Sequence, residues 1–241
     1  MRLALIPARL GSTRFPEKVL ADCGGVPLIQ RVCEAVARCE TLERLVVATD
    51  SPRVAGVVEG FGAEAVLTSP GHPNGTSRLG EAADILGLAD DDVVVNVQGD
   101  EPGIRPAVIE AAVAALEESG APTGTVGSPF AADEDPASPH IVKVVRGADG
   151  RALYFSRAQI PHDRDGGGVA ALKHVGLYVY RRRFLRTYAG LAPTPLENTE
   201  KLEQLRVIEH GYRMQVAVAE THHRGIDTPA DLASFLRAGG V

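Results

Sequence analysis

Short apolar segments alternate with longer amphipathic segments through residues 1–120, and this alternation limits the fold more than any other feature of the chain. The apolar segments predict four buried strands, at Arg2–Ile6, Arg44–Ala48, Glu64–Leu67 and Asp92–Val97. The segments between and after them predict helices that begin at Pro27, Pro52, Ser77 and Ala107. Regular alternation of strand and helix is typical of a parallel sheet with helices on both faces.

The pattern changes after residue 120. A hairpin is predicted where Asp149-Gly150 separates the apolar segments Ile141–Val145 and Ala152–Phe155, because Asp-Gly favours a tight turn. The remaining elements are predicted as strands at Lys173–Tyr180 and Met214–Ala219, a helix at Leu196–His210 and a last helix capped by Thr228. The second half should therefore be a smaller mixed α+β portion that shapes a second substrate site.

Composition narrows the class of protein. Lys and Arg number 25 against 31 Asp and Glu, and this net charge of −6 argues weakly against a nucleic-acid partner, which usually requires a basic surface. The cysteines Cys23, Cys33 and Cys39 form no C-x-x-C pair and are expected to be free thiols of a reducing compartment. No segment reaches the roughly 20 apolar residues of a membrane helix. We therefore expect a soluble, cytoplasmic protein without a membrane partner.

A cationic loop follows the first predicted strand. It carries Arg9, Arg14 and Lys18, with Gly11, Ser12 and Thr13 between them. Ligands of open α/β sheets bind beyond the carboxyl ends of the strands, and cations with free backbone N–H groups suit a polyphosphate. A merely solvated basic loop is the less favoured alternative. The G-x-x-x-x-G-K-[ST] motif of P-loop proteins is absent.

Two aspartates are candidates for a metal site. Asp100 follows the strand that ends at Val97, and Asp227 follows a second strand region. A lone aspartate at such a position is often a turn or helix cap. Two carboxylates from distant segments, together with phosphate oxygens, nevertheless match the preference of Mg²⁺ for few protein ligands.

The chain resembles the 3-deoxy-manno-octulosonate (Kdo) cytidylyltransferases, also called CMP-Kdo synthetases. The resemblance covers nearly the whole length, and its stretches stand in the family's order. They are IPARLGSTRFPEK (Ile6–Lys18), VATD (Val47–Asp50), NGTSRLGE (Asn74–Glu81), VNVQGDEP (Val95–Pro102), VKVV (Val142–Val145), ALYFSRAQIP (Ala152–Pro161), KHVGLYVYR (Lys173–Arg181), PLENTEKLEQLRVIEHG (Pro195–Gly211) and GIDTPADL (Gly225–Leu232).

The resemblance implies a role for each matching residue. Arg9, Arg14 and Lys18 would hold the CTP phosphates and, with Asp100, form the catalytic set. The nucleotide pocket would contain Ala8, Ser77, Arg78 and Gln98. The sugar acid would be bound by Arg157, His174, Tyr178, Glu203 and Gln204. Magnesium would be held by Asp100 and Asp227.

From the residues alone, the sugar-site assignments are less specific. Arg157 follows an apolar strand and could pair with a carboxylate, or form a structural ion pair equally well. His174 lies on a strand that otherwise faces the core, where a core histidine is the commoner case. Glu203 and Gln204 flank the apolar side of their predicted helix, which a solvated face would also explain. His222 and His223 are adjacent on an extended segment and are interpreted as loop surface, not as a metal pair.

The chain departs from the family pattern at two places. Phe15-Pro16-Glu17-Lys18 stands where Leu-Pro-Gly-Lys is common, which puts the backbone geometry of that loop in question. Asp163–Val169 is short and Gly-rich beside the usual insert, so a variant sugar acid such as 8-amino-Kdo or a neuraminate stays open. A nucleotide-sugar glycosyltransferase and a non-catalytic nucleotide sensor are the alternatives outside this class.

The resemblance implies that CTP and Kdo are the partners, with Mg²⁺ as cofactor, in lipopolysaccharide biosynthesis. It also implies a homodimer. A single nucleotidyltransferase domain is expected over 1–241. Residues 1–120 would bind CTP, residues 121–224 would bind the sugar acid and form the dimer, and residues 225–241 would return to the nucleotide half with a metal-site turn and a helix.

Overall fold

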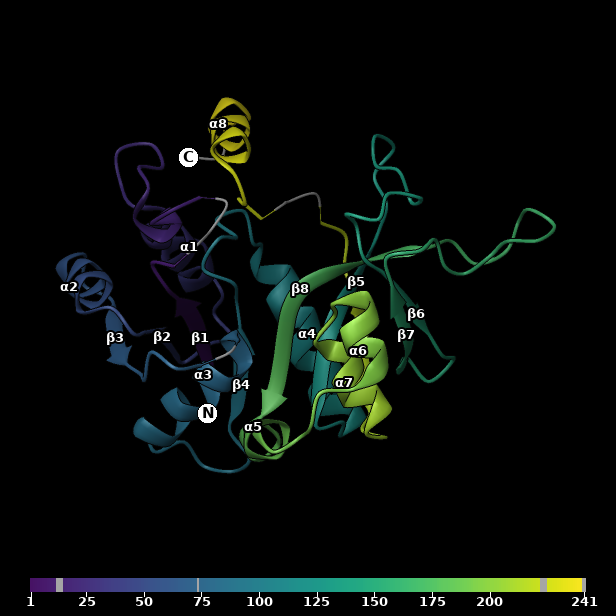
Figure 1. Cartoon of the computed structure of the whole chain (residues 1–241), viewed down its shortest axis with the longest axis horizontal. Helices are drawn as coiled ribbons and strands as arrows, with labels where there is room; N and C mark the ends of the chain where they lie inside the picture. Colours follow the sequence, from purple (N-terminus) through teal and green to yellow (C-terminus); the bar gives the residue numbers. More distant parts are fainter. Residues whose placement is uncertain (12–14, 73, 222–224, 240–241) are drawn as a thin grey trace.

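The computed structural model describes residues 1–11, 15–72, 74–221 and 225–239. In this described part the strands form one sheet, in the order β3-β2-β1-β4-β8-β5-β9, with β6 paired to β7 and β8 (Figure 1). The strands are β1 Arg2–Ala8, β2 Arg44–Thr49, β3 Glu64–Leu67, β4 Val93–Asn96, β5 Thr123–Pro129, β6 Lys143–Arg146, β7 Ala152–Ser156, β8 Leu172–Arg181 and β9 Met214–Val218.

The helices cover both faces of this sheet. They are a short 3-10 helix η1 Lys18–Leu20, then α1 Leu28–Ala37, α2 Pro52–Gly60, α3 Gly75–Ile85, α4 Pro106–Ser119, α5 Arg182–Ala189, α6 Pro195–Glu200, α7 Gln204–Glu209 and α8 Pro229–Arg237. Alternate residues of β1 separate the two cores: Ile6 packs with α1 and α4, whereas Leu5 packs with α3, α5 and α7. The α/β fold class with helices on both faces is therefore confirmed.

The first half is parallel, as its alternation predicted. Strand β1 pairs in parallel with β2 and β4, and β2 pairs in parallel with β3. Ser51 caps α2 by accepting a hydrogen bond from the backbone N–H of Val54, and Thr228 and Asp231 form a capping box on α8. Helix α3 begins two residues before its predicted start, because the Asn74 side chain caps it by accepting from Ser77 N–H.

The second half continues the same sheet. Strand β8 lies between β4 and β5 and is antiparallel to both, whereas β5 is parallel to β9. The predicted hairpin forms as β6 and β7 and attaches to the start of β8. The sheet is thus mixed at this end, while its first four strands are parallel.

The sequence patterns did not predict strand β5, which is buried but has the composition Thr-Gly-Thr-Val-Gly-Ser-Pro. It is stable inside the sheet because its hydroxyl groups find partners there. The Thr123 hydroxyl donates to the Val179 carbonyl, and the Thr125 hydroxyl donates to the Leu177 carbonyl at 2.7 Å. Satisfied hydroxyls can be buried at little cost, so this strand needs no apolar run.

The predicted single helix Leu196–His210 is wrong, because two short helices, α6 and α7, occupy that segment. The first ends at Lys201, whose φ of 56° lies in the left-handed region. Arg206 on α7 forms an ion pair with Glu197 on α6, at 2.5 Å between Nη2 and Oε1, and this pair joins the two helices. Because of this break, Glu203 and Gln204 lie at the start of a new helix, and both line a cavity.

The C-terminal segment packs against the first loop of the chain. Ile226 and Leu232 form a small core with Cys23 and Leu28, and Phe15 packs against it. The three cysteines are buried, free thiols, as expected. None of the helices found among the described residues combines the length and apolar character that crossing a bilayer needs.

Candidate functional site

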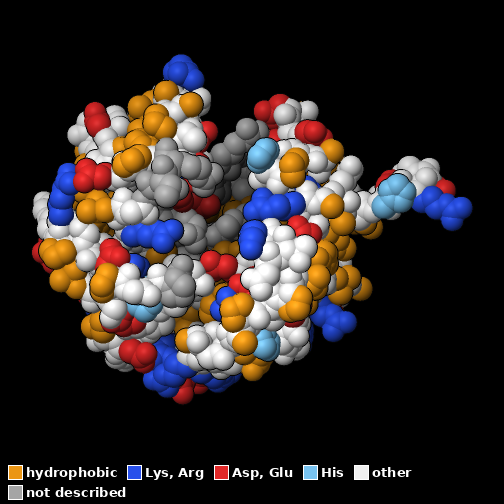
Figure 2. All heavy atoms as spheres, viewed as in Figure 1, with side chains coloured by type: hydrophobic (Ala, Val, Ile, Leu, Met, Phe, Trp, Pro, Cys, Tyr) orange, Lys and Arg blue, Asp and Glu red, His pale blue; other side chains and the backbone are white. Residues whose placement is uncertain are grey.

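A hollow lies between the parallel strands and the β5–β7 region, with acidic side chains inside it and Lys and Arg side chains on its rims (Figure 2). Three adjoining cavities occupy this region. The first is lined by Pro7, Ala8, Arg9, His72, Asn74, Gly75, Arg78 and Gln98. The second, of about 290 Å³, shares Gly75 and Gln98 with the first. The third, of about 570 Å³, contains Asp227 and His174 and meets the second at Gly176.

Lys18, Asp100 and Asp227 meet at one point of this hollow. The Lys18 Nζ atom lies 2.5 Å from Asp100 Oδ2 and 3.3 Å from Asp227 Oδ1. The two acidic segments are joined through the backbone, because Ile226 N–H donates to the Asp100 carbonyl at 2.8 Å. Asp100 and Asp227 are 82 and 209 positions away from Lys18 along the chain. The sequence predicted that all three would converge at the carboxyl edge of the sheet, and the structure brings them together.

Glycine and a strained residue make this convergence possible. A Cβ atom on Gly99 would stand 3.0 Å from the Pro7 carbonyl oxygen, so only glycine lets the Asp100 turn lie against β1. Glu17 has a φ of 54°, in the left-handed region that favours glycine. The family's common glycine at this position is thereby explained. A glycine would adopt this φ without strain, whereas Glu17 adopts it at a cost of about 1 kcal/mol.

The electrostatics of Asp100 suit a site that takes a further cation. Burial raises the pKa of Asp100 above its usual value, and the adjacent Lys18 ammonium only partly offsets this effect. Within the described residues, no group of three or more His, Cys, Asp or Glu side chains is placed to hold a metal. The Asp100–Asp227 pair, with phosphate oxygens added, fits magnesium, which takes few protein ligands.

The first cavity has the features of a nucleotide pocket. Arg78, which is 3% exposed, donates to Asp50 Oδ2 at 2.8 Å and to Thr68 Oγ1 at 2.6 Å, so its guanidinium is fixed in place. Ala8 is buried beneath the cavity, and Arg9 is exposed at its edge. Gln98 lies between this cavity and the second, and its amide donates to Asn96 Oδ1. Arg14 lies outside the described residues, as do His222 and His223.

Ser77, a predicted pocket residue, belongs to a hydrogen-bonded group with Ser69, His72 and Glu81, which the sequence did not predict. His72 Nδ1 lies 3.1 Å from the Ser77 hydroxyl, and its Nε2 contacts Glu81. Hydrogen bonds from His72 and Ser69 lower the pKa of Glu81 to about 2. The proximity of His72 to the family stretch Asn74–Glu81 could have indicated a role for this histidine. It was missed because His72 lies in a loop, where no hydrophobic periodicity indicates which side chains face a site.

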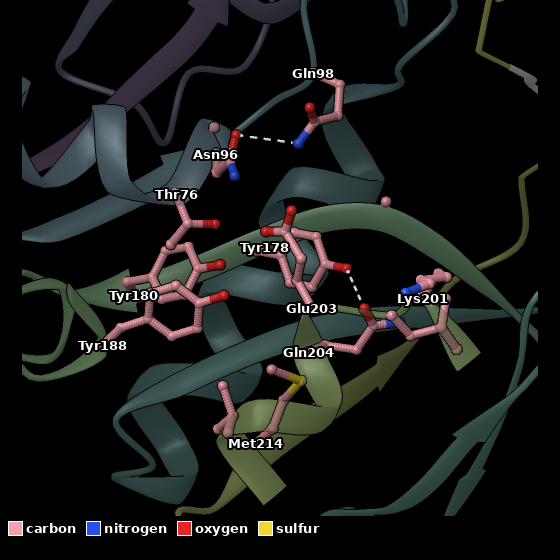
Figure 3. A pocket seen from close by; sticks show the side chains of 14 residues that line it. Thr76, Asn96, Gln98, Tyr178, Tyr180, Tyr188, Lys201, Glu203, Gln204 and Met214 are labelled. Atoms are coloured by element: carbon pink, nitrogen blue, oxygen red, sulfur yellow. Dashed lines mark hydrogen bonds between the residues drawn. The ribbon is translucent and has the colours of Figure 1, made fainter. Parts of the chain in front are cut away.

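Tyr178, Glu203 and Gln204 line the second cavity together (Figure 3). The Tyr178 hydroxyl donates to Gln204 Oε1 at 3.2 Å, and burial raises the pKa of Tyr178 well above its usual value. Glu203 is exposed to solvent, but desolvation by the surrounding protein atoms still raises its pKa. Thr76, Asn96, Tyr180, Tyr188, Lys201 and Met214 also line this cavity, and the sequence had assigned a binding role to none of them.

His174 and Arg157 do not line that cavity. His174 lines the third cavity and contacts Thr125 Oγ1 at 2.9 Å, and its ring packs against Phe155 and Tyr178. The Arg157 side chain donates to the backbone carbonyls of Glu200 and Pro139. Those bonds hold the Nε and Nη1 atoms of Arg157 to its own framework, so its predicted pairing with a sugar carboxylate would use the remaining N–H groups of the guanidinium.

Two bulged residues explain how one strand lines two cavities. Along β8, Val175 pairs with Val126 whereas Tyr178 pairs with Thr125, so Gly176 and Leu177 are extra residues. A Cβ atom on Gly176 would lie 3.3 Å from Glu101 Oε1. The bulge therefore places Gly176 between the cavities, with His174 on one side and Tyr178 on the other.

We expect His174 to be uncharged at neutral pH. The ring is partly open to its cavity, yet the surrounding protein atoms lower its pKa to about 3 by desolvation. An unfolded chain takes up this proton near pH 6.5, so the neutral ring stabilises the fold fully above pH 6.5 and loses this contribution between pH 6.5 and about 3.

The measurement is the free energy of unfolding against pH for the parent protein and for His174→Gln. Between pH 6 and 4 the parent should lose stability more steeply than the variant, by up to about 1.4 kcal/mol per pH unit. Parallel curves would contradict the neutral ring.

Comparisons with known proteins show the family to which this chain is similar. The Cytidylyltransferase family profile matches residues 3–216. A 3-deoxy-manno-octulosonate cytidylyltransferase of Syntrophobacter fumaroxidans is 50% identical over 237 residues, covering 97% of this chain and 95% of the relative. That of Geobacter sulfurreducens is 47% identical over 245 residues, covering 97% of both chains. A solved CMP:2-keto-3-deoxy-manno-octonic acid synthetase in complex with CTP is 38% identical, with a TM-score of 0.92 over 100% of this chain and 99% of that one.

Proposed function

The chain belongs to the 3-deoxy-manno-octulosonate cytidylyltransferases, and we infer from this premise that it transfers CMP from CTP to 3-deoxy-D-manno-octulosonate, releasing pyrophosphate. The observation that carries the inference is the meeting of Lys18, Asp100 and Asp227 at one point of the hollow, where Asp227 lines the third cavity and this cavity adjoins that of Tyr178 at Gly176. A triphosphate and a sugar acid could meet there, because cationic and acidic groups lie together beside adjoining cavities.

We propose the following chemistry at this point. The anomeric hydroxyl oxygen of the sugar acid forms a bond to the α-phosphorus, while the bond from that phosphorus to the bridging oxygen of pyrophosphate breaks in line. The hydroxyl proton passes to solvent, and the electron pair leaves with pyrophosphate. Such transfers depend on positioning and on neutralising charge, not on a covalent nucleophile.

The side chains divide this work according to their charge. Lys18, Arg9 and Arg14 would neutralise the charge that develops on the leaving pyrophosphate. Asp100 and Asp227 would hold magnesium, which when bound polarises the α-phosphate. Because Lys18 already contacts both carboxylates, the site holds its acidic groups together before any ligand arrives.

Nucleotide-sugar glycosyltransferases commonly carry an Asp-x-Asp metal motif at a strand end, and this chain has two candidate stretches for it, Asp163–Asp165 and Asp90–Asp92. The Asp163 carboxylate accepts from the backbone N–H groups of Gly166, Gly167 and Gly168 in an exposed loop, where it shapes a turn. Asp91 and Asp92 precede β4, at the end of the strand opposite Asp100, and Asp92 pairs with the N-terminal ammonium. Neither acidic stretch reaches the hollow.

Pyrophosphate release is the direct test. With Kdo present, CTP should release pyrophosphate at a rate at least about 100-fold above that with ATP, GTP or UTP, because a pocket built to hydrogen-bond one base rejects the others strongly. Omitting Kdo should abolish release. Release from CTP without any sugar acid would point to a hydrolase, and binding of CTP without release would support the nucleotide sensor.

The same assay resolves the choice of sugar acid. We propose Kdo as the preferred substrate, with 8-amino-Kdo and a neuraminate as the compounds to compare. Family membership also supports a homodimer, a cytoplasmic location and a place in lipopolysaccharide biosynthesis as parts of this proposal. Sedimentation of the purified protein would test the dimer independently of activity.

A further inference from the structure

The inner end of the second cavity contains a tyrosine hydroxyl without a partner. Tyr188 is 3% exposed, and its hydroxyl has no hydrogen-bond partner among the residues that the structure describes. In Figure 3 this hydroxyl points into the cavity beside that of Tyr180. A buried hydroxyl without a partner costs folding free energy, so phenylalanine would be the better residue if packing were the only requirement.

The Tyr188 ring is held in place from behind. The Arg206 guanidinium lies over the ring, 5.2 Å from its centre, and Arg206 is itself paired with Glu197. The hydroxyl therefore has a fixed position, set by the short helices that the break at Lys201 creates. A fixed, desolvated donor is the arrangement that recognises a ligand hydroxyl most selectively.

The surroundings of Tyr188 indicate the chemistry of that ligand. The inner wall is formed by neutral polar groups and one thioether, from Thr76, Asn96, Tyr180, Tyr188 and Met214. Lys201 and Glu203, the charged residues of the lining, are exposed to solvent, and burial together with the Glu203 carboxylate raises the pKa of the Tyr188 hydroxyl. A wall of hydroxyls and amides suits an uncharged polyol, because the nearby cation, Arg206, lies behind the Tyr188 ring and is already paired with Glu197.

We propose that the Tyr188 hydroxyl determines specificity by binding a hydroxyl of the C7–C8 end of the sugar acid, the end remote from the reacting carbon. This proposal rests on the proposed function. In this binding mode the carboxylate and anomeric carbon of the sugar acid face Lys18 and Asp100. The C7–C8 end of the sugar acid lies at the inner wall. Tyr188 thus discriminates between sugar acids of different chain length.

The test combines Tyr188→Phe with two substrates, Kdo and the six-carbon 3-deoxy-2-keto acid that lacks carbons 7 and 8. We expect Tyr188→Phe to lower kcat/KM for Kdo about tenfold, as the loss of one hydrogen bond predicts, and to leave kcat/KM for the six-carbon acid unchanged. The KM for CTP should not change. The variant should melt no lower than the parent, because no bond within the protein is lost.

Tyr212→Phe is the matched control, since Tyr212 is exposed and packs on Phe184 outside the cavity. It should leave both substrates unaffected. An equal fall of kcat/KM for both acids in Tyr188→Phe, or no fall for Kdo, would overturn the proposal. If the parent protein releases no pyrophosphate from CTP and Kdo, the proposed function fails instead, so the two failures are distinguishable.

Discussion

Replacing Asp100 with asparagine is expected to lower turnover by about a thousandfold, with little change in melting temperature. The amide keeps the shape of the side chain but loses the charge that faces Lys18 at 2.5 Å and that would help hold a divalent cation. Burial raises the pKa of Asp100, so at neutral pH the ionised carboxylate costs folding free energy that the amide does not. Function and stability should therefore separate at this residue.

The measurement is pyrophosphate release across a magnesium titration, with thermal unfolding in parallel. Asp91→Asn is a suitable control, because Asp91 pairs with Arg183 on the surface before β4. This substitution removes the same charge as Asp100→Asn, but far from the hollow. Parent-like turnover of Asp100→Asn at saturating magnesium would remove Asp100 from the metal site.

Lys18→Ala should lower turnover by several orders of magnitude, with a nearly unchanged KM for Kdo. The Lys18 side chain is 11% exposed and lies between two carboxylates, from which it can move to the phosphates when CTP binds. Loss of a preorganised charge facing the leaving group typically costs about 10²–10³ in rate, and the loss of order in the acidic pair adds to this.

The same substitution has a second readout, which needs no substrate. The Lys18 ammonium lies between Asp100 Oδ2 and Asp227 Oδ1, the oxygens proposed to hold magnesium. Without nucleotide, Lys18→Ala should therefore bind Mg²⁺ more tightly than the parent protein, as measured by calorimetric titration. Arg164→Ala, at a fully solvated loop, controls for the general loss of a positive charge. Weaker magnesium binding in Lys18→Ala would show that these oxygens are not the site.

The sequence could predict this part of the site because topology alone brings it together. Asp100 follows a parallel strand, and the Ile226 N–H bond to the Asp100 carbonyl joins the second acidic segment to it. The carboxyl ends of parallel strands share one edge, so residues distant along the chain meet there without any further information. The helix caps at Ser51 and Thr228 are similarly local and were predictable.

The sugar side could not be predicted from periodicity. Its cavity depends on a helix break at Lys201, where a lysine adopts a conformation more usual for glycine, and on a bulge within β8. Both depend on tertiary contacts, such as the pair of Arg206 with Glu197, that override local preference. Tyr188 lies on α5, which was not predicted, so its hydroxyl could not be placed at the cavity from the sequence.

The position of β8 in the sheet also bears on how the chain folds as it is synthesised. Strands β4 and β5 end at residues 96 and 129, but the strand that lies between them ends only at Arg181. Until the ribosome has released it, β4 and β5 each present an unpaired edge, the feature most prone to pair with other chains. At about 5–20 residues per second this state lasts roughly 3–10 s. Translation speed through residues 130–181 therefore sets how long the facing edges of β4 and β5 stay open to pairing with other chains.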